Sequence, residues 1–461
     1  MTTSLFSTLP LSPAQLANLD TLGYTAMTEI QEASLPAILD GRDLIAQAKT
    51  GSGKTATFGL GILHKLHTQR FAIQALVICP TRELADQVAV ELRRLARAES
   101  NIKIVTLVGG TPMRGQIESL EHGVHIAVGT PGRLLDHIER KSIDLSNLET
   151  LVLDEADRMV DMGFFDDIVR VVAACPPKRQ TLLFSATYPD SIRKDAGRFL
   201  NNPLEIKVQA QHNAAQIEQY FFEISPDGRN AAVAQLLNHY RPASTLAFCN
   251  TKVQVRSLAE DLRAQGFSAL ALHGDLEQRD RDEVLVQFAN GSCAVLVATD
   301  VAARGLDIQS LAAVINVDVT RDTEVHIHRI GRTGRSGEKG LALNLCSPEE
   351  MQAANLIETY QGKPLKWEDL KSRTATEGGP VRAPMVTLIV LGGKKDKLRP
   401  GDLLGALTND GGLTREQVGK INVTDSVSYV ALERSIARAT LARLSEGTIK
   451  GKRFRMKFIG A

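Results

Sequence analysis

Two short segments of this chain carry side chains suited to phosphate and metal chemistry. The first reads Ala48-Lys49-Thr50-Gly51-Ser52-Gly53-Lys54-Thr55. Its glycines let backbone N–H groups turn inward around phosphate oxygens. Lys54 supplies a positive charge to the outer phosphates, and Thr55 supplies a hydroxyl group to Mg²⁺. The segment therefore indicates a phosphate-binding loop, although such loops usually begin with Gly where this chain has Ala48. A flexible Gly/Ser turn is the alternative.

The second segment, Asp154-Glu155-Ala156-Asp157, is acidic. A carboxylate at position 154 can hold Mg²⁺ through its water ligands, and the next carboxylate can orient or deprotonate an attacking water molecule. An acidic turn that caps a helix is the alternative for an isolated group of this kind. Because the chain also carries the phosphate loop, we favour a nucleotide-hydrolysing pair over two unrelated turns.

Both segments follow short apolar runs, at residues 44–46 and 151–153. Such runs are typical of buried strands in a parallel sheet. Open α/β sheets bind their ligands at the carboxyl ends of the strands. We therefore expect the phosphate loop and the acids to lie at one edge of one sheet.

Apolar runs alternate with helix-like stretches twice along the chain. The first series includes residues 75–78, 126–128, 151–153 and 181–184. The second includes residues 245–248, 269–272, 295–297, 314–317 and 341–343. Each series predicts an α/β lobe with a doubly wound parallel sheet covered by helices. We predict a first lobe over 1–208, a polar linker over 209–216 and a second lobe over 217–365, with a cleft between the lobes.

The last part of the chain differs in pattern and charge. After a second linker, predicted at 366–384, residues 385–461 form a module of their own. We expect strands at 385–391, 418–423, 427–432 and 453–459 and helices at 400–407 and 435–444. This βαββαβ order indicates the α+β, ferredoxin-like arrangement of many RNA-recognition (RRM-like) domains. Residues 381–461 hold 15 Lys/Arg and 7 Asp/Glu, a net +8, so the rest of this +1 chain carries −7, which suggests a nucleic-acid-binding tail.

Further motifs follow in order along the two predicted lobes. They are residues 23–31 (ending in Gln31), 80–85 (PTRELA), 109–110 (GG), 130–133 (TPGR), 185–187 (SAT), 250–251 (NT), Gln278 with Arg281, 298–307 (ATDVAARGLD) and 328–335 (HRIGRTGR). With the phosphate loop and the acids, this set resembles the DEAD-box RNA helicases over roughly residues 6–345. The resemblance implies two RecA-like lobes, ATP and Mg²⁺ as cofactors, and an ATP hydrolase that acts on RNA.

The resemblance also implies a role for each matching residue. Adenine recognition is implied for Phe6, Tyr24, Thr28 and Gln31, with Met27 where the family usually has Pro. Contact with the ribose is implied for Asp307, and the metal ligands are Thr55 and Asp154, mostly through water. The catalytic set is Lys54, Asp154, Glu155, Arg332 and Arg335. Coupling between the lobes is implied for Asp157, Ser185, Thr187 and His328, and RNA contact for Arg82, Gly110, Thr130, Arg133, Gly274, Thr299 and Arg304.

The two catalytic arginines lie in the second lobe, where an arginine fork can stabilise charge on the transferring phosphoryl group. Hydrolysis is therefore expected to require closure of the lobes, and RNA that bridges both lobes should favour closure.

Two basic clusters make the tail a candidate RNA-binding surface. Their members are Lys394, Lys395 and Lys397 in one and Lys450, Lys452, Arg453 and Arg455 in the other. Alternation over 453–458 places cations on one strand face and apolar side chains on the other, although a solvated strand face is the alternative. Where RRM sheets stack bases, only Tyr429 is aromatic and Val427 takes the other place, so we expect recognition through loops and basic edges.

Core and tail together resemble one bacterial branch of the family. That resemblance implies a target, the hairpin 92 region of 23S ribosomal RNA, in pre-ribosomal particles during assembly of the large subunit. Nothing in composition or spacing gives this target.

Composition limits where the protein acts. The five cysteines, at 79, 175, 249, 293 and 346, form no CxxC pair, which favours reduced, buried thiols over zinc or disulfides. The N-terminus lacks the basic and apolar regions of a signal peptide, and no apolar run approaches membrane-spanning length. We expect a cytoplasmic monomer without a membrane partner.

Two other function classes remain open from the sequence. One is an RNA-binding clamp without productive hydrolysis, against which the intact Lys54, Glu155, Arg332 and Arg335 argue. The other is a DNA helicase, against which the hydroxyl-rich motifs and the RNA-type tail argue. An ATPase assay with RNA and with DNA distinguishes all three.

Overall fold

The computed structural model describes residues 4–48, 51–185, 199–208, 217–303, 311–334, 339–409 and 411–459. The chain forms two compact units, and the change from one to the other falls between strands β7 and β8. The first unit is called lobe 1 below. The second holds lobe 2 and the C-terminal domain. The predicted linker 209–216 lies outside the described residues.

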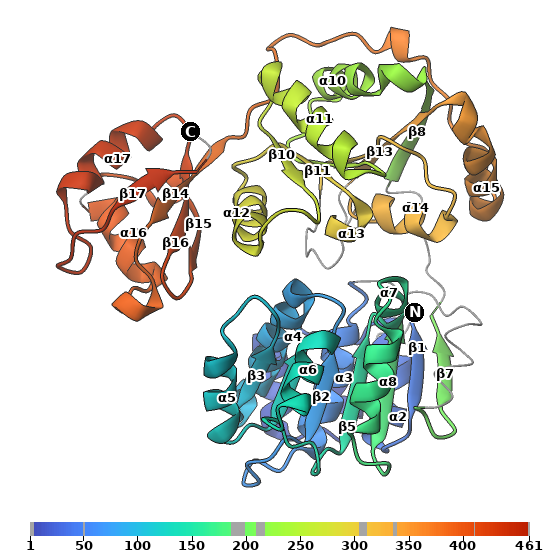
Figure 1. Ribbon diagram of the computed structural model, residues 1–461, viewed down its shortest axis with the longest axis vertical. Coiled ribbons are helices and arrows are strands. Elements are labelled where there is room, and N and C mark those ends of the chain that lie inside the picture. The colour runs from blue at the N-terminus through green and yellow to red at the C-terminus, as the bar shows by residue number, and fades with distance from the viewer. Residues whose placement is uncertain are drawn as a thin grey trace. The chain divides into compact units, whose positions relative to one another are not determined.

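Lobe 1 is built on a seven-stranded parallel sheet (Figure 1). Its strands lie in the order β3 (Ile104–Leu107), β4 (Ile126–Gly129), β2 (Ala75–Ile78), β5 (Thr150–Asp154), β6 (Gln180–Ser185), β1 (Leu44–Gln47) and β7 (Leu204–Lys207). The central strands are buried on both faces, as expected when helices cover a parallel sheet.

Two hydrophobic cores lie on the two faces of this sheet. One packs α1 (Pro13–Thr21), α2 (Glu29–Leu39), α3 (Lys54–Lys65) and α4 (Arg82–Leu95) against the sheet. The other packs α6 (Pro131–Glu139), α7 (Ala156–Asp161) and α8 (Phe165–Ala173), with part of α5 (Met113–Glu121). Val77 faces the first core, whereas Leu76 and Ile78 face the second, which is the alternation of a strand between two helical layers.

Lobe 2 repeats this design with a six-stranded parallel sheet. The order is β10 (Ala269–Leu272), β11 (Val295–Ala298), β9 (Thr245–Phe248), β12 (Ala313–Asn316), β13 (Gly340–Cys346) and β8 (Ile217–Glu223). Its described helices are α10 (Arg229–Tyr240), α11 (Lys252–Ala264), α12 (Gln278–Ala289), α13 (Asp300–Ala303), α14 (Thr323–Ile330) and α15 (Met351–Gln361). The prediction of two doubly wound α/β lobes is confirmed.

The C-terminal domain is a four-stranded antiparallel sheet with two helices on one face (Figure 1). The strand order is β15 (Val418–Val423), β16 (Ser428–Glu433), β14 (Met385–Val390) and β17 (Met456–Phe458), and the helices are α16 (Pro400–Asn409) and α17 (Ala437–Glu446). The chain order is therefore βαββαβ, as predicted. The last strand is shorter than the predicted 453–459.

Most of the segment between β13 and β14 lies along lobe 2. The Phe221 N–H of β8 donates to the Lys366 carbonyl at 2.8 Å, and the Trp367 ring lies 5.4 Å from the Phe221 ring. Farther along, Gln235 Nε2 of α10 donates to two backbone carbonyls of this segment. The first half of the predicted linker 366–384 is thus held by hydrogen bonds to α10 and β8.

Among the described helices, none is both long and apolar enough to span a bilayer.

Candidate functional site

The motifs of lobe 1 gather at one edge of its sheet because each follows a parallel strand. The phosphate loop follows β1, PTRELA follows β2, the GG pair follows β3 and TPGR follows β4, while Asp154 ends β5 and Ser185 ends β6. The described residues of all six segments therefore lie on the side of the sheet where α/β proteins bind ligands.

The phosphate loop turns from β1 into α3, which begins at Lys54. Gly53 has a φ of +98°, and a Cβ atom there would lie 2.7 Å from Nε2 of Gln31, so only glycine fits. The Ala48 N–H donates to the Ser185 carbonyl at 2.9 Å, which joins the start of the loop to the SAT segment. Lys49 and Thr50 lie outside the described residues.

Three buried polar atoms beside this loop have no hydrogen-bond partner among the described residues: Lys54 Nζ, Ser52 Oγ and Asp154 Oδ1. Lys54 is 6% exposed and Asp154 is 3% exposed. Buried charged groups are costly unless they are paired or bind a ligand. An ammonium group, a hydroxyl group and a carboxylate together suit a phosphate chain with a divalent cation.

Asp154 ends β5, and Glu155 directly precedes α7 with a left-handed backbone at φ 53°. Burial raises the pKa of Asp154 to about 6, and the Lys54 charge only partly offsets this. Glu155 forms an ion pair with Arg158, and both side chains are nearly buried. The Asp157 N–H donates to Ser185 Oγ at 3.3 Å, so the acidic turn is fastened to β6. The sequence analysis missed Arg158, although it lies one helical turn after Glu155.

Two of the predicted adenine-reading residues contact the phosphate loop, and the other two contact each other. Gln31 is 1% exposed; its Oε1 accepts from the Thr28 N–H at 2.8 Å, and its Nε2 donates to the Gly53 carbonyl at 3.3 Å. Thr28 Oγ1 donates to the Ser52 carbonyl at 2.8 Å. Tyr24 and Phe6 pack edge to face with their ring centres 6.2 Å apart. The geometry thus brings the four predicted residues together in two pairs: Thr28 with Gln31 at the phosphate loop, and Tyr24 with Phe6.

The predicted RNA-contacting residues of lobe 1 occupy neighbouring strand ends. Gly110 is exposed with a φ of +75°, and Thr130 precedes the first turn of α6. Arg82 covers the adjacent Gly109, where a Cβ atom would come within 2.8 Å of its guanidinium. Arg133 points inward: its side chain is 13% exposed, and Nη1 donates to the Thr111 carbonyl at 3.1 Å and to Gln116 Oε1 at 3.0 Å.

Four of the predicted site residues of lobe 2 belong to the part of the chain that the structure describes, and they lie in or next to β10, β11 and α14. Gly274 is exposed after β10, Thr299 is 9% exposed after β11, and Arg332 follows α14 at 8% exposure. His328 is half-buried in α14. Four predicted residues, Thr187, Arg304, Asp307 and Arg335, lie outside the described residues.

Arg329 is the residue that sequence reasoning missed in lobe 2. It is 2% exposed and donates through Nε and Nη2 to both carboxylate oxygens of Asp300, at 2.8 and 2.6 Å. Its guanidinium also donates to Asn250 Oδ1, Asn316 Oδ1 and the Asp318 carbonyl. One buried cation therefore ties together the NT, ATD and HRIGR segments. Its place inside a motif was visible in the sequence, but its partners were not.

The two basic clusters of the C-terminal domain meet in space. Lys450 Nζ donates to the Lys397 carbonyl at 3.0 Å, and the Leu391 N–H donates to the Arg455 carbonyl at 2.9 Å. All seven predicted cations of these clusters are exposed: Lys394, Lys395, Lys397, Lys450, Lys452, Arg453 and Arg455. Phe454, Met456 and Phe458 pack on the core instead, so the predicted alternation of faces is confirmed.

The sheet face opposite the helices of this domain is not open. Tyr429 is 7% exposed, and burial raises its pKa, with a further contribution from Glu283 of α12 in lobe 2. Thr387 Oγ1 of β14 lies 2.8 Å from Ser292 Oγ, which follows α12. These contacts agree with recognition through loops and edges, because the single aromatic side chain on this face is covered.

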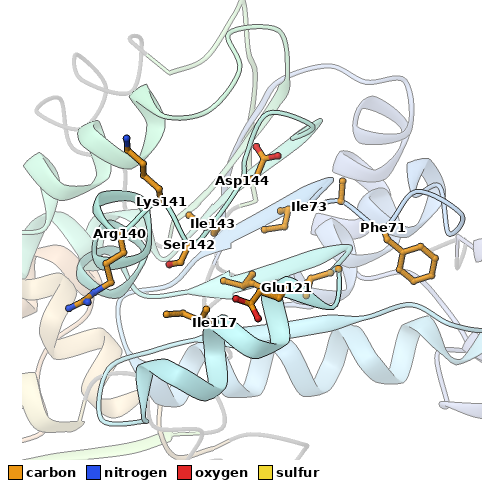
Figure 2. A pocket seen from close by; sticks show the side chains of 13 residues that line it. Phe71, Ile73, Ile117, Glu121, Arg140, Lys141, Ser142, Ile143 and Asp144 are labelled. Carbon is orange, nitrogen blue, oxygen red and sulfur yellow. The ribbon is translucent and has the colours of Figure 1, made fainter.

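A surface cavity of about 700 Å³ lies elsewhere in lobe 1 (Figure 2). Phe71 and Ile73 line it ahead of β2, Ile117 and Glu121 line it from α5, and residues 140–144 line it after α6. None of the predicted catalytic, nucleotide-binding or RNA-contacting residues belongs to its lining.

Three protein families match consecutive parts of this chain. The DEAD/DEAH box helicase family matches residues 28–195, the helicase conserved C-terminal domain matches 228–337, and the DbpA RNA binding domain matches 387–458.

Relatives of known name and structure cover most of the chain. It is 52% identical over 455 residues to the ATP-dependent RNA helicase DbpA of Escherichia coli K12, a match that spans 98% of this chain and 99% of that protein. It is 45% identical to the DEAD-box ATP-dependent RNA helicase CshA of Bacillus cereus, over 78% of this chain and 68% of the relative. The structure of S. cerevisiae Dbp5 bound to RNA and ADP BeF3 matches 80% of this chain and 96% of its own, with 31% identity and a TM-score of 0.73. The chain therefore belongs to the DEAD-box family of ATP-dependent RNA helicases and carries an RNA-binding domain of the DbpA type.

Proposed function

We propose that this protein couples RNA-stimulated ATP hydrolysis to local unwinding of RNA duplexes. We further propose that its C-terminal domain directs it to the hairpin 92 region of 23S ribosomal RNA during assembly of the large subunit. The observation that carries the ATPase proposal is the buried set of Lys54 Nζ, Ser52 Oγ and Asp154 Oδ1, which have no hydrogen-bond partner among the described residues. The ribosomal target rests on the resemblance of the whole chain to the DbpA branch.

In this proposal each residue of lobe 1 acts on a different part of ATP. Lys54 binds the outer phosphates, and Thr55 and Asp154 hold Mg²⁺, largely through water. Bound Mg²⁺ would neutralise charge that develops on the phosphoryl oxygens. Glu155 orients the attacking water and takes its proton, and Arg158 fixes the carboxylate through their ion pair.

Adenine binding would be communicated directly to the phosphates. Gln31 has an amide suited to an adenine edge, and its Nε2 already donates to the Gly53 carbonyl. A base bound to Gln31 is therefore linked, through the Gly53 carbonyl, to the loop that positions Lys54. Arg332 and Arg335 belong to the other lobe, so turnover requires the lobes to close, and RNA bound to both lobes lowers the free energy of closure.

The ATPase proposal is tested with two lysines of the same helix. Lys54→Met should abolish nucleotide binding and RNA-stimulated hydrolysis, because the substitution removes the charge at the phosphates. Lys65→Met is the matched control: Lys65 is at the other end of α3, where it donates to Gln180 Oε1. Equal loss of hydrolysis in both variants would refute the assigned role of Lys54.

RNA specificity is tested by ATPase titrations with three nucleic acids. A 23S fragment that contains hairpin 92 should stimulate hydrolysis far more than a scrambled RNA of equal length. Equal stimulation by both RNAs would overturn the ribosomal target and leave a non-specific helicase. DNA that stimulates as well as RNA would indicate a DNA helicase, and absence of hydrolysis with every RNA would indicate a clamp.

The C-terminal domain is tested by ending the chain before residue 384. The shortened protein should lose its preference for the hairpin and keep weak, non-specific stimulation. In the full chain, Lys452→Ala or Arg455→Ala should lower the salt dependence of RNA binding by roughly one unit of slope for each phosphate that the side chain neutralises. An unchanged slope would place the RNA on another surface.

A further inference from the structure

We propose that Gln116 and His137 are positioning residues for the RNA-contacting surface of lobe 1. Neither side chain was singled out from the sequence, and both lie beneath the surface that carries Gly110, Thr130 and Arg133. The inference rests on the proposed RNA contacts of those three residues. It adds that a buried pair of hydrogen-bonding side chains sets their relative position.

The amide of Gln116 links three segments of the chain. It is 7% exposed in α5, and Nε2 donates to the Val108 carbonyl at 2.9 Å and also to Thr111 Oγ1, both after β3. Oε1 accepts from Arg133 Nη1 at 3.0 Å and from His137 Nε2 at 2.9 Å, both in α6. The amide thus uses both hydrogens and both lone pairs of its oxygen.

Chemistry fixes the orientation of this amide. A carbonyl oxygen such as that of Val108 can only accept, and a guanidinium such as that of Arg133 can only donate. Turning the amide over would place nitrogen against Arg133 and oxygen against Val108, and neither hydrogen bond could then form. Gln116 therefore has one orientation that satisfies its neighbours.

His137 completes the link on the far side. Its ring is 0% exposed, and Nε2 must carry the hydrogen because it faces the acceptor Oε1 of Gln116. Nδ1 lies 2.8 Å from Ser142 Oγ, whose hydroxyl also donates to the His137 carbonyl at 3.2 Å, and Ser142 lines the cavity of Figure 2. Burial and the Arg133 charge lower the pKa of His137, with Arg140 acting in the same direction and Asp136 against it. The lowered pKa favours the neutral ring, with its hydrogen on Nε2.

The result is a fixed distance between two surface elements. Arg133 Nη1 donates to the Thr111 carbonyl as well as to Gln116, so the GG loop and the start of α6 share one buried centre. Gly110, at a φ of +75°, has no side chain that could anchor its loop by packing. Loss of the Gln116 amide should therefore let this loop and Arg133 move apart while the sheet stays intact.

The test compares two buried glutamines of lobe 1. Gln116→Leu removes the amide under the RNA surface. Gln180→Leu is the matched control: Gln180 is 5% exposed and makes three hydrogen bonds, to Ile38, Arg42 and Lys65, at the opposite ends of the strands. Both variants should lose a comparable amount of fold stability, because each removes a buried amide with several hydrogen bonds. Only Gln116→Leu is expected to raise the KM for a hairpin-free single-stranded RNA in the ATPase assay, by about tenfold, which corresponds to about 1.4 kcal/mol, the size of one net hydrogen bond.

The affinity for ATP in the absence of RNA should stay the same in both variants. His137→Gln, whose amide nitrogen takes the place of Nε2, should retain most of the RNA affinity that His137→Leu loses. An equal rise of the RNA KM in the two glutamine variants, or none in either, would overturn the inference. Arg82→Ala separates the two proposals: if it weakens RNA binding while Gln116→Leu does not, the positioning role is wrong, and if neither does, the RNA surface of lobe 1 is wrong as well.

Discussion

Arg329 offers a prediction whose size follows from its contacts. Replacing it with Met removes a buried cation and leaves the Asp300 carboxylate without its partner. Breaking a buried ion pair from one side costs about 3–5 kcal/mol. The Arg329 side chain is 2% exposed, but that of Asp300 is 25% exposed, so water can hydrate the Asp300 carboxylate once its partner is removed. We therefore expect the lower end, a loss of about 3 kcal/mol in the unfolding free energy of lobe 2.

The only tryptophan of the chain makes lobe 2 separately observable. Trp367 packs on Phe221 of β8, so its fluorescence reports the unfolding of this lobe in the full-length protein. With a urea m-value of about 2 kcal/mol/M, Arg329→Met should lower the midpoint by about 1.5 M. The control Arg279→Met breaks a surface pair with Glu283, in which Arg279 is 74% exposed, and should cost at most about 0.5 kcal/mol.

A double variant tests the cause of the loss. Asp300→Asn removes the charge that Arg329→Met leaves unpaired, so the double variant should be clearly more stable than the sum of the two single losses predicts. If the single Arg329→Met variant shifts the midpoint no more than Arg279→Met does, the buried cation contributes nothing and the reasoning fails. Strict additivity in the double variant would show that the two side chains act independently.

Three further predictions concern chemistry. Glu155→Gln should bind ATP and RNA normally and lose turnover, measured by equilibrium binding and steady-state hydrolysis; normal turnover would refute its role with water. Because the pKa of Asp154 is raised to about 6, hydrolysis should fall as the pH drops through this value and Asp154 takes up a proton. Higher Mg²⁺ should move this acid limb to lower pH, because the cation favours the carboxylate, and an unmoved limb would argue against Mg²⁺ at Asp154. All five cysteines are buried, and burial raises the pKa of each thiol, to about 11 for Cys175 and Cys346, so the native protein should react slowly with a thiol reagent at pH 8 and the unfolded protein with five equivalents.

The sequence predicted the central strands because their signal is local. Ten strands were placed from runs of apolar residues, and in β2, β9 and β10 the observed bounds equal the predicted ones. Strands β3 and β7 at the edges of the lobe 1 sheet were missed. In β7, exposed Glu205 and Lys207 alternate with Leu204 and Ile206, so there is no continuous apolar run. In β3, Thr106 interrupts the apolar residues and only Leu107 is buried. Strand β8, at the edge of the lobe 2 sheet, was also missed, because polar residues interrupt its first half and only Phe221 and Phe222 are consecutive buried apolar residues.

In the candidate site, too, residues within sequence motifs could be predicted, whereas contacts that depend on the tertiary structure could not. Motif residues could be named because their order along the chain is itself the signal. Their buried partners could not: Arg329 meets Asp300, Asn316 and Asn250, which come from three other segments. Gln116 and His137 likewise carry no pattern of their own, and their role is visible only once α5 and α6 lie against the loop after β3.

The hydrogen bonds that hold the chain after β13 against lobe 2 also limit the distance between the C-terminal domain and this lobe. Thr376 Oγ1 donates to the Asn238 carbonyl of α10. Within residues 377–384, Arg241 donates to the Gly379 carbonyl, and the Ala383 N–H donates to Ser268 Oγ at 3.2 Å, just before β14 begins. The chain therefore stays on lobe 2 up to the first strand of the domain. An RNA captured by the C-terminal domain is therefore presented to lobe 2 at an effective concentration on the order of millimolar. The helicase lobes bind RNA weakly and without sequence preference, but at this effective concentration their RNA site is filled even when the RNA is scarce in solution. A long Gly/Ser insertion within residues 377–384 would lower the effective concentration and leave every binding surface unchanged.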